Sequence, residues 1–212
     1  MKYLHLSLIC LVALLFISCD EVTQKGESLG KELQSAWGDT TAIRRIDARF
    51  QLIADSLHIP GMRNQLSTAF LRSVGKNDSI QAVAQVIAYT IEDFADKNAS
   101  PIVDGLRDGS LTAETATSKL ALMLWAADAV AKNDYIDALG KEIDQIADRL
   151  SEKDQMKLFA SATSPAKLGR AMLVERSAAG ADTTALDKKA EMLKDILNET
   201  QYQEFIQAYQ SK

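Results

Sequence analysis

Apolar side chains recur every three or four positions along most of the chain after residue 39. The first series contains Ile43, Ile46, Phe50, Ile53 and Leu57. An α-helix has 3.6 residues per turn, so this spacing places all five on one stripe of a helix. Asp39 or Thr40 is suited to cap its start, and Pro60-Gly61 ends it. The pattern predicts an amphipathic helix between these two signals.

The same period continues to the C-terminus. Similar apolar series predict further helices over 62–74, 78–94, 133–150, 182–197 and 198–209. Ser100-Pro101 and Ser164-Pro165 each supply an N-cap and an N1 proline, and Asn198 and Gln201 have the spacing of a capping box. No segment shows the alternation of a strand. We therefore expect an all-α fold.

The segment 120–130 reads LALMLWAADAV and is the most apolar one after the N-terminal run. Because it is apolar around most of its circumference, it predicts a core helix with neighbours on several sides. Leu124 and Trp125 are among its large side chains. Both are expected to support the stability of the fold.

Two pairs of segments resemble one another. Val74–Val83 parallels Val130–Leu139, and 39–43 parallels 182–186. Asn77 and Asn133 are expected to end helices in the left-handed conformation, before Asp78 and Asp134 cap the next ones. The offsets are 56 and 143 residues, which share no period, whereas a repeat array has a constant one. We expect an irregular single-domain bundle over 39–212, with diverged helical hairpins as the alternative.

The N-terminus carries a different pattern. Lys2 precedes the apolar run Tyr3–Ile17, which ends abruptly in polar sequence. A membrane-spanning helix needs about 20 apolar residues, and this run is shorter. The pattern is typical of a secretory signal peptide over residues 1–18.

The junction reads Phe16-Ile17-Ser18-Cys19 and resembles the lipobox of bacterial lipoproteins, with Phe16 where that family usually has leucine. The resemblance implies a diacylglycerol on the Cys19 sulfur, cleavage before Cys19 and fatty acids such as palmitate on the mature chain. Cys10 leaves with the signal peptide, so Cys19 is the sole thiol left. Two or three acyl chains hold a protein on a membrane stably. An ordinary signal peptide and an uncleaved anchor remain the alternatives.

The stretch 19–38 is polar and small, and contains Gly26 and Gly30. It predicts an acylated cysteine followed by a polar tether, with at most a short helix that docks through Trp37. Asp20 directly after the cysteine resembles the inner-membrane retention signal of proteobacterial lipoproteins. Asp20-Glu21 also resembles the acidic tract of surface lipoproteins in Bacteroidota. We expect a membrane-anchored protein of the bacterial cell envelope, with the outer membrane favoured and the inner membrane or cell surface as alternatives.

Charge and composition narrow the classes of function. The chain has 24 Lys and Arg against 29 Asp and Glu, a net charge of -5 and a pI near 5.1. A nucleic-acid partner is therefore not expected, because phosphate binding needs clustered basic side chains. The 3 Pro and 10 Gly are too few for a turn-rich all-β fold.

Motifs of catalysis and metal binding are incomplete. Ser164 and Lys167 have the Ser-x-x-Lys spacing of penicillin-binding enzymes, but the other signatures of that family are missing, so Ser164 is predicted to be a helix cap. The loop from Asp104 to Thr115 lacks the ligands of a calcium site. His58 is the only imidazole after cleavage and is expected to end a helix. No catalytic residue, cofactor or metal is predicted from these motifs.

Two classes of function remain. The first is a non-enzymatic, lipid-anchored helical domain that binds an envelope protein or polymer. Within it, Leu197-Asn-Glu-Thr-Gln201 is distantly similar to the Leu-Thr-x-x-Gln motif of helical periplasmic chaperones. The alternative is a carboxylate-dependent envelope enzyme, a lyase or glycan-acting protein, with candidates Asp93, Asp96, Asp104 and Asp108.

Overall fold

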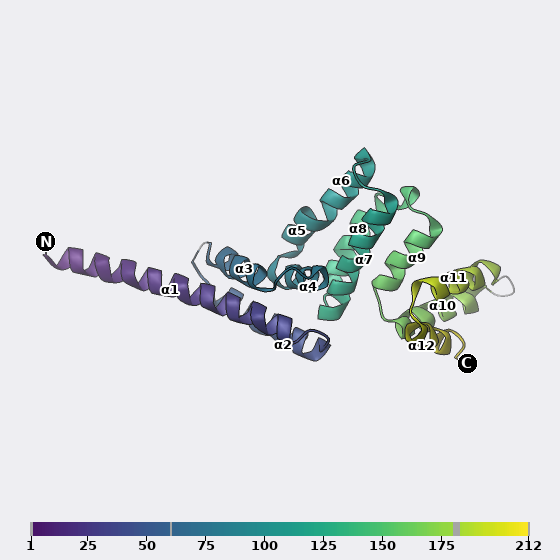
Figure 1. Ribbon diagram of the computed structural model, residues 1–212, viewed down its shortest axis with the longest axis horizontal. Helices are drawn as coiled ribbons and strands as arrows, with labels where there is room; N and C mark the ends of the chain where they lie inside the picture. Colours follow the sequence, from purple (N-terminus) through teal and green to yellow (C-terminus); the bar gives the residue numbers. More distant parts are fainter. Residues whose placement is uncertain (1, 60, 180–182, 212) are drawn as a thin grey trace. The chain divides into compact units, whose positions relative to one another are not determined.

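The computed structural model describes residues 2–59, 61–179 and 183–211, with side chains described from Cys19 onward (Figure 1). The described residues form helices joined by short turns, and none of them belongs to a β-strand. The expected all-α fold is therefore confirmed. The chain divides into two compact units, Met1–Thr90 and Ile91–Lys212.

The first unit consists of α1 (Lys2–Ser35), α2 (Thr40–Ser56), α3 (Met62–Ser73) and α4 (Asp78–Ala88). Asp39 caps α2 as predicted, since its Oδ1 accepts hydrogen bonds from the N–H groups of Thr41 and Ala42 at 2.9 and 3.0 Å. The apolar stripe of α2 faces the core, where the rings of Phe50 and Phe70 pack with centroids 5.1 Å apart.

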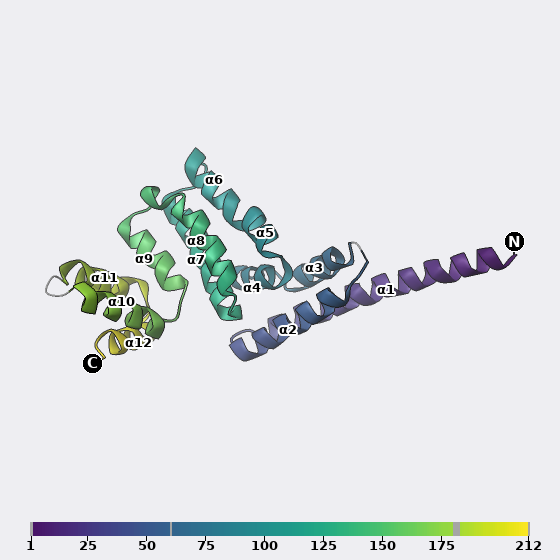
Figure 2. The ribbon, with the colours of Figure 1, turned by 180° about the vertical axis from the view of Figure 1, so that it is seen from behind.

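The stretch expected to be a polar tether is instead helical and packed. α1 and α3 lie side by side (Figure 1, and from behind in Figure 2). A Cβ at Gly26 would lie 2.7 Å from the Leu66 carbonyl oxygen, and one at Gly30 would lie 2.6 Å from that of Phe70. These glycines therefore let the two backbones approach closely. Val22, Leu29 and Leu33 are buried, whereas Trp37 is 38% exposed. The structure thus differs from the expected domain start at residue 39.

The second unit begins with α5 (Ile91–Phe94), the π-helix η1 (Ala95–Ala99) and α6 (Ser100–Asp108). The sequence predicted a fresh helix start at Ser100-Pro101. Instead Ala99 and Ser100 are both helical, and the Ser100 hydroxyl donates to the Ala95 carbonyl at 3.3 Å. The wider π-turn leads into α6 without a break, and Pro101 lies in the first turn of α6.

α7 (Ala113–Val130) and α8 (Asn133–Asp144) follow, then the short 3-10 turn η2 (Ala147–Arg149). The apolar segment 120–130 lies within α7. Leu120 and Leu124 are buried as predicted, at 0% and 2% exposure. Trp125 is 40% exposed, so the apolar circumference of α7 is not buried on every side.

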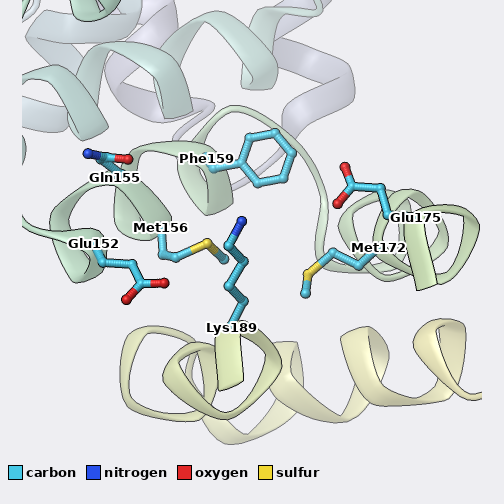
Figure 3. Close-up of a pocket in the computed structure, with 7 residues that line it drawn as sticks. All are labelled: Glu152, Gln155, Met156, Phe159, Met172, Glu175 and Lys189. Atoms are coloured by element: carbon cyan, nitrogen blue, oxygen red, sulfur yellow. The ribbon is translucent and has the colours of Figure 1, made fainter. Parts of the chain in front are cut away.

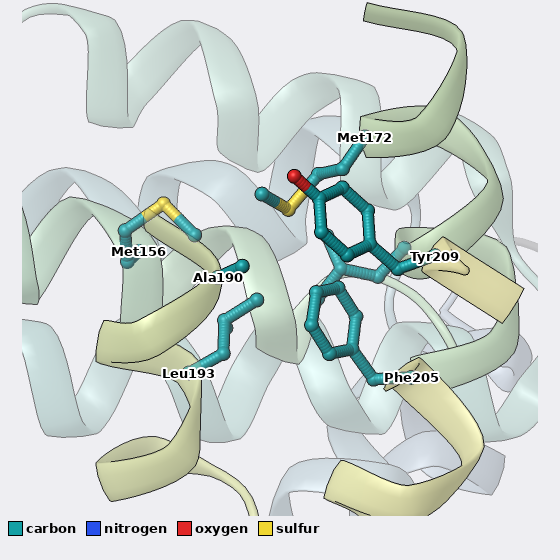
Figure 4. Close-up of a cluster of buried hydrophobic side chains, with 7 residues drawn as sticks. Met156, Met172, Ala190, Leu193, Phe205 and Tyr209 are labelled. Carbon is teal, nitrogen blue, oxygen red and sulfur yellow. The ribbon is translucent and has the colours of Figure 1, made fainter. Parts of the chain in front are cut away.

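The chain ends in α9 (Glu152–Ser161), α10 (Pro165–Ala179), α11 (Thr184–Ile196) and α12 (Glu199–Tyr209). The buried side chains that join these four helices form one cluster (Figure 4): Met156, Leu168, Met172, Ala190, Leu193, Phe205 and Tyr209. Gly169 lets α12 approach α10, since a Cβ there would lie 2.8 Å from the Ala208 Cβ. The predicted capping box of Asn198 and Gln201 is confirmed. Asp182, the expected start of α11, lies outside the described residues.

The two similar segments, Val74–Val83 and Val130–Leu139, share a backbone feature. Gly75 and Ala131, which correspond at the offset of 56, have φ values of 75° and 62°. The left-handed residue therefore lies two positions before the predicted Asn77 and Asn133. Asn77 instead caps α4 by accepting from the N–H groups of Ser79 and Ile80.

Candidate functional site

Cys19, the predicted lipidation site, lies on α1 where this helix meets the first turn of α3. Its side chain is partly exposed. Its carbonyl oxygen accepts hydrogen bonds from the Gln65 side-chain amide at 3.0 Å and from the Thr23 hydroxyl at 3.1 Å. The Gln65 amide also donates to the Thr23 hydroxyl at 2.8 Å. The backbone of Cys19 is thus tied to the fold, although the residue itself is only partly buried.

A second candidate site surrounds Phe159 in the unit Ile91–Lys212. Two adjoining pockets share Gln155 and Phe159. One, of about 300 Å³, lies among α9, α10 and α11, and the other, of about 660 Å³, lies among α7, α8 and α9. We call the two together the Phe159 groove. Phe159 is 48% exposed, although most phenylalanines with described side chains are buried in this fold.

The local sequence of α9 explains why Phe159 faces outward. Ser151 caps the helix by accepting from the Asp154 N–H at 3.1 Å. Met156 and Leu158 are turned toward the core, with exposures of 7% and 3%. Phe159 directly follows Leu158, so it lies about 100° further around the helix and toward the groove. A rigid helix therefore presents the ring.

The smaller pocket combines apolar and charged side chains. Figure 3 shows Lys189 extending from α11 between Met156 and Met172, toward the ring of Phe159. Glu152 and Glu175 lie on opposite sides of this lysine. Glu152 also pairs with Lys188, with 3.1 Å between Oε2 and Nζ. The methionines provide an adaptable apolar lining, and the glutamates place negative charge on the rim.

The larger pocket is more apolar. Its lining includes Leu124, Ile136, Ile143 and Leu158, and its charged members are Asp137, Asp144 and Lys141. Over both pockets the lining has four acidic and two basic side chains. The Phe159 groove is therefore an apolar surface with an acidic rim.

The Ser164 motif and the Asp104–Thr115 loop lie at the ends of helices. The Ser164 Oγ accepts from the Lys167 backbone N–H at 3.4 Å, so Ser164 sits at the start of α10 as a cap. In the loop after α6, Gly109 has a φ of 82° and the Asp108 carboxylate accepts from the Ser110 N–H at 2.8 Å. This hydrogen bond lowers the pKa of Asp108. The geometry is that of a helix end followed by a turn.

The four aspartates proposed for an enzyme lie on α5, η1 and α6. Asp93 pairs with Lys97 at 3.1 Å, and Asp104 pairs with Arg107 at 3.5 Å. Asp96 and Asp108 are exposed, and none of the four lines the Phe159 groove. His58 is exposed after α2. Among the residues with described side chains, no group of His, Cys, Asp and Glu is placed to hold a metal ion.

Sequence reasoning assigned Phe159 to the apolar pattern of the bundle and did not single out Glu152, Glu175 or Lys189. Met156 and Phe159 are three residues apart, which is helical spacing for one stripe. The sequence signal for the outward position of Phe159 is that the neighbouring position 158 is also apolar. When 156, 158 and 159 are all apolar, one of them must leave the stripe, and here it is Phe159.

Comparison with known proteins gives the chain no relative from which a function could be transferred. No family model matches the chain, and neither a curated protein nor a solved structure matches it. Within the part of the chain whose side chains are described, no helix combines the length and the hydrophobicity that a membrane span requires.

Proposed function

We propose that this chain is a lipoprotein of the bacterial cell envelope, anchored through a lipid on Cys19, whose Phe159 groove binds a basic amphipathic segment of an envelope protein. The observation that carries the proposal is the half-exposed ring of Phe159 between two adjoining apolar pockets with an acidic rim. Exposed aromatic side chains at the centre of a concave surface are typical anchors of binding interfaces.

The shape and lining of the groove favour a helical segment over a small ligand. The larger pocket is an open trough between helices rather than an enclosed cavity, and its apolar lining comes from α7, α8 and α9. An amphipathic helix places apolar side chains in such a trough at i, i+3, i+4 and i+7. Methionines beside the ring can adjust to different apolar side chains.

Charge favours a basic partner. The unit Ile91–Lys212 contains 21 acidic and 15 basic residues, a net charge of -6, whereas residues 19–90 contain eight of each. The excess of acidic side chains thus belongs to the unit that carries the groove. A segment with Lys or Arg around its apolar face would be attracted to the rim carboxylates, which speeds association and selects against acidic segments.

The anchor is tested in bacterial cells with Cys19→Ala. Unaltered protein should incorporate a clickable palmitate analogue and float with membranes. The Cys19→Ala variant should lose the palmitate label, because it has no thiol at the lipobox position to accept the lipid. Undiminished labelling of the variant contradicts the lipoprotein assignment.

The groove is tested with a fluorescein-labelled 14-residue amphipathic helix of Leu and Lys. Phe159→Ser should weaken its binding by about tenfold or more, as loss of a central aromatic anchor does. Val174→Ser is the matched control, since Val174 is 69% exposed on α10 and does not line the groove. A peptide with Glu in place of Lys should bind more weakly than the Leu and Lys peptide. Equal binding by the Phe159 variant and the unaltered protein would remove the groove from the proposal.

A further inference from the structure

The position of Cys19 removes any flexible spacer between a lipid on its sulfur and the folded unit. Gln65, on α3, holds the Cys19 carbonyl at 3.0 Å. Val22, three residues later on α1, is 5% exposed. The residue that would carry the acyl chains therefore lies within a helix that is held against α3. A lipid there would fix this end of the unit at the membrane surface.

An exposed apolar side chain lies at the same end. The Met62 N–H donates to the Ile59 carbonyl at 3.2 Å, so Ile59 directly precedes the first turn of α3. That turn also contains Gln65, the partner of Cys19. The Ile59 residue is 43% exposed. We call the region made of Cys19, Ile59 and Met62–Gln65 the anchor end.

The direction of α1 indicates which way this end faces. The backbone of α1 is one helix from Lys2 to Ser35, so it continues past the anchor end as a single rod (Figure 1). The apolar run of the precursor thus leaves the unit along the α1 axis. Before cleavage this axis leads into the lipid, and after cleavage the acyl chains on Cys19 leave from the same point.

We infer that the acylated protein stands on the bilayer through the anchor end, with the Ile59 side chain buried at the boundary between headgroups and acyl chains. This inference rests on the proposed lipidation of Cys19. Apolar side chains at this depth add to the affinity that acyl chains provide. Electrostatic repulsion from anionic lipids is small, because residues 19–90 have balanced charge and Glu21 is paired with Lys25 at 2.7 Å.

The test measures how deeply two positions lie in the membrane. Ile59→Cys supplies a single reactive thiol, because the Cys19 thiol of the acylated chain is blocked. A bimane label is attached, and the acylated protein is placed in phosphatidylethanolamine and phosphatidylglycerol vesicles that contain nitroxide-headgroup lipids. Ser35→Cys is the matched control, since α1 places it about 24 Å from Cys19 along the helix axis. Ser56→Cys, exposed at the end of α2, gives a second reporter near the anchor end.

Nitroxide lipid should quench the label at position 59 about threefold more than at position 35, as expected for a side chain within the roughly 5 to 10 Å interfacial layer. Position 56 should also be quenched more than position 35. Equal quenching at 59 and 35, or none at 59 while the protein still floats with the vesicles, overturns the inference. Protein that carries no acyl mass and does not float overturns the proposed lipidation itself, which is a distinguishable result.

Discussion

Leu124 and Trp125 are neighbours on α7 with opposite surroundings. Leu124 is 2% exposed and Trp125 is 40% exposed. We expect Leu124→Ala to lower the free energy of unfolding by about 2 to 5 kcal/mol, because it leaves a cavity in the core. Trp125→Ala should cost about 1 kcal/mol, as at other partly exposed positions. Thermal unfolding followed by circular dichroism measures both, and a larger loss for Trp125→Ala would contradict the assignment of Leu124 to the core.

Thr117 is a buried polar residue whose hydroxyl is unsatisfied. It is 0% exposed on α7, and its Oγ1 has no hydrogen-bond partner among the described groups. We expect Thr117→Val to raise the free energy of unfolding by about 1 to 2 kcal/mol, since the isosteric valine has no polar group to desolvate. Thr200→Val, at an exposed position on α12, is the control and should change stability by less than about 0.5 kcal/mol. A destabilised Thr117→Val would show that the hydroxyl is satisfied in solution.

At the scale of helices, the contact between α1 and α3 depends on glycine. We expect Gly30→Ala to lower the free energy of unfolding by about 1 to 3 kcal/mol, because its Cβ would overlap the Phe70 carbonyl. Gly140→Ala on α8 is the matched control. A Cβ there meets no atom within 4 Å, so alanine should be neutral or stabilise α8 by about 0.5 to 1 kcal/mol through helix propensity. Chemical denaturation of the two variants compares the effects directly.

The three C-terminal helices are joined by a titratable cluster. Hydrogen bonds from Thr183 and then from Tyr209 hold the pKa of Asp187 below its usual value. Burial, and then the hydrogen bond to Asp187, raise the pKa of Tyr209 above 10.0. Arg176 lies over the Tyr209 ring, 5.1 Å from its centroid, and is 3.6 Å from the Asp187 carboxylate.

The two pKa shifts predict that the folded state loses stability at low pH through Asp187 and at high pH through Tyr209. The Asp187 contribution is complete above its unfolded pKa and is lost as pH falls through the lowered folded pKa. The Tyr209 contribution is complete below pH 10.0 and is lost as pH rises through the raised folded pKa. Tyr209→Phe should remove the alkaline loss and weaken the acid dependence, while its ring still stacks on Phe205. Thermal unfolding midpoints measured across pH, for both proteins, check this.

Sequence patterns identified helices well wherever one apolar stripe and a cap define them. Asp39, Ser164 and Asn198 all start helices as predicted, because capping is decided within a few residues. The patterns missed α1 after Cys19, whose packing against α3 uses Gly26 and Gly30 in place of large apolar side chains. They also missed the outward position of Phe159, which depends on which neighbours fill the core.

At the scale of the whole molecule, the sequence does not reveal the division after Thr90. Apolar residues recur at helical spacing equally regularly before and after Thr90. The helices of both units also start and end at similar types of residue. The apolar positions predict that there is a core, but only the tertiary contacts show which helices share one. The proposed lipidation site, in contrast, is predicted from a short motif that needs no tertiary contact.

The packing of α1 sets where an intact chain must begin. A chain that starts at Asp20 contains no cysteine, so we expect it to be helical and to unfold identically with and without reductant. A chain that starts at Asp39 lacks the helix that covers Leu66 and Phe70, both 0% exposed in the complete unit. It should aggregate or unfold at a lower temperature. Circular dichroism and light scattering compare the two chains, and equal stability would contradict the role of α1.

The hydrogen bonds from Gln65 and Thr23 to the Cys19 carbonyl also bear on the order of folding and cleavage. A peptidase acts on a chain segment that is opened from its fold, and Cys19 lies in a helix that is held against α3 through its carbonyl. Maturation and folding therefore compete for the same few residues in the proposed lipoprotein. Cleavage before α1 packs against α3 should need no opening of the fold, whereas cleavage afterwards should require this end to fray. The order of events during export, and not only the motif, then decides how much of the protein is processed.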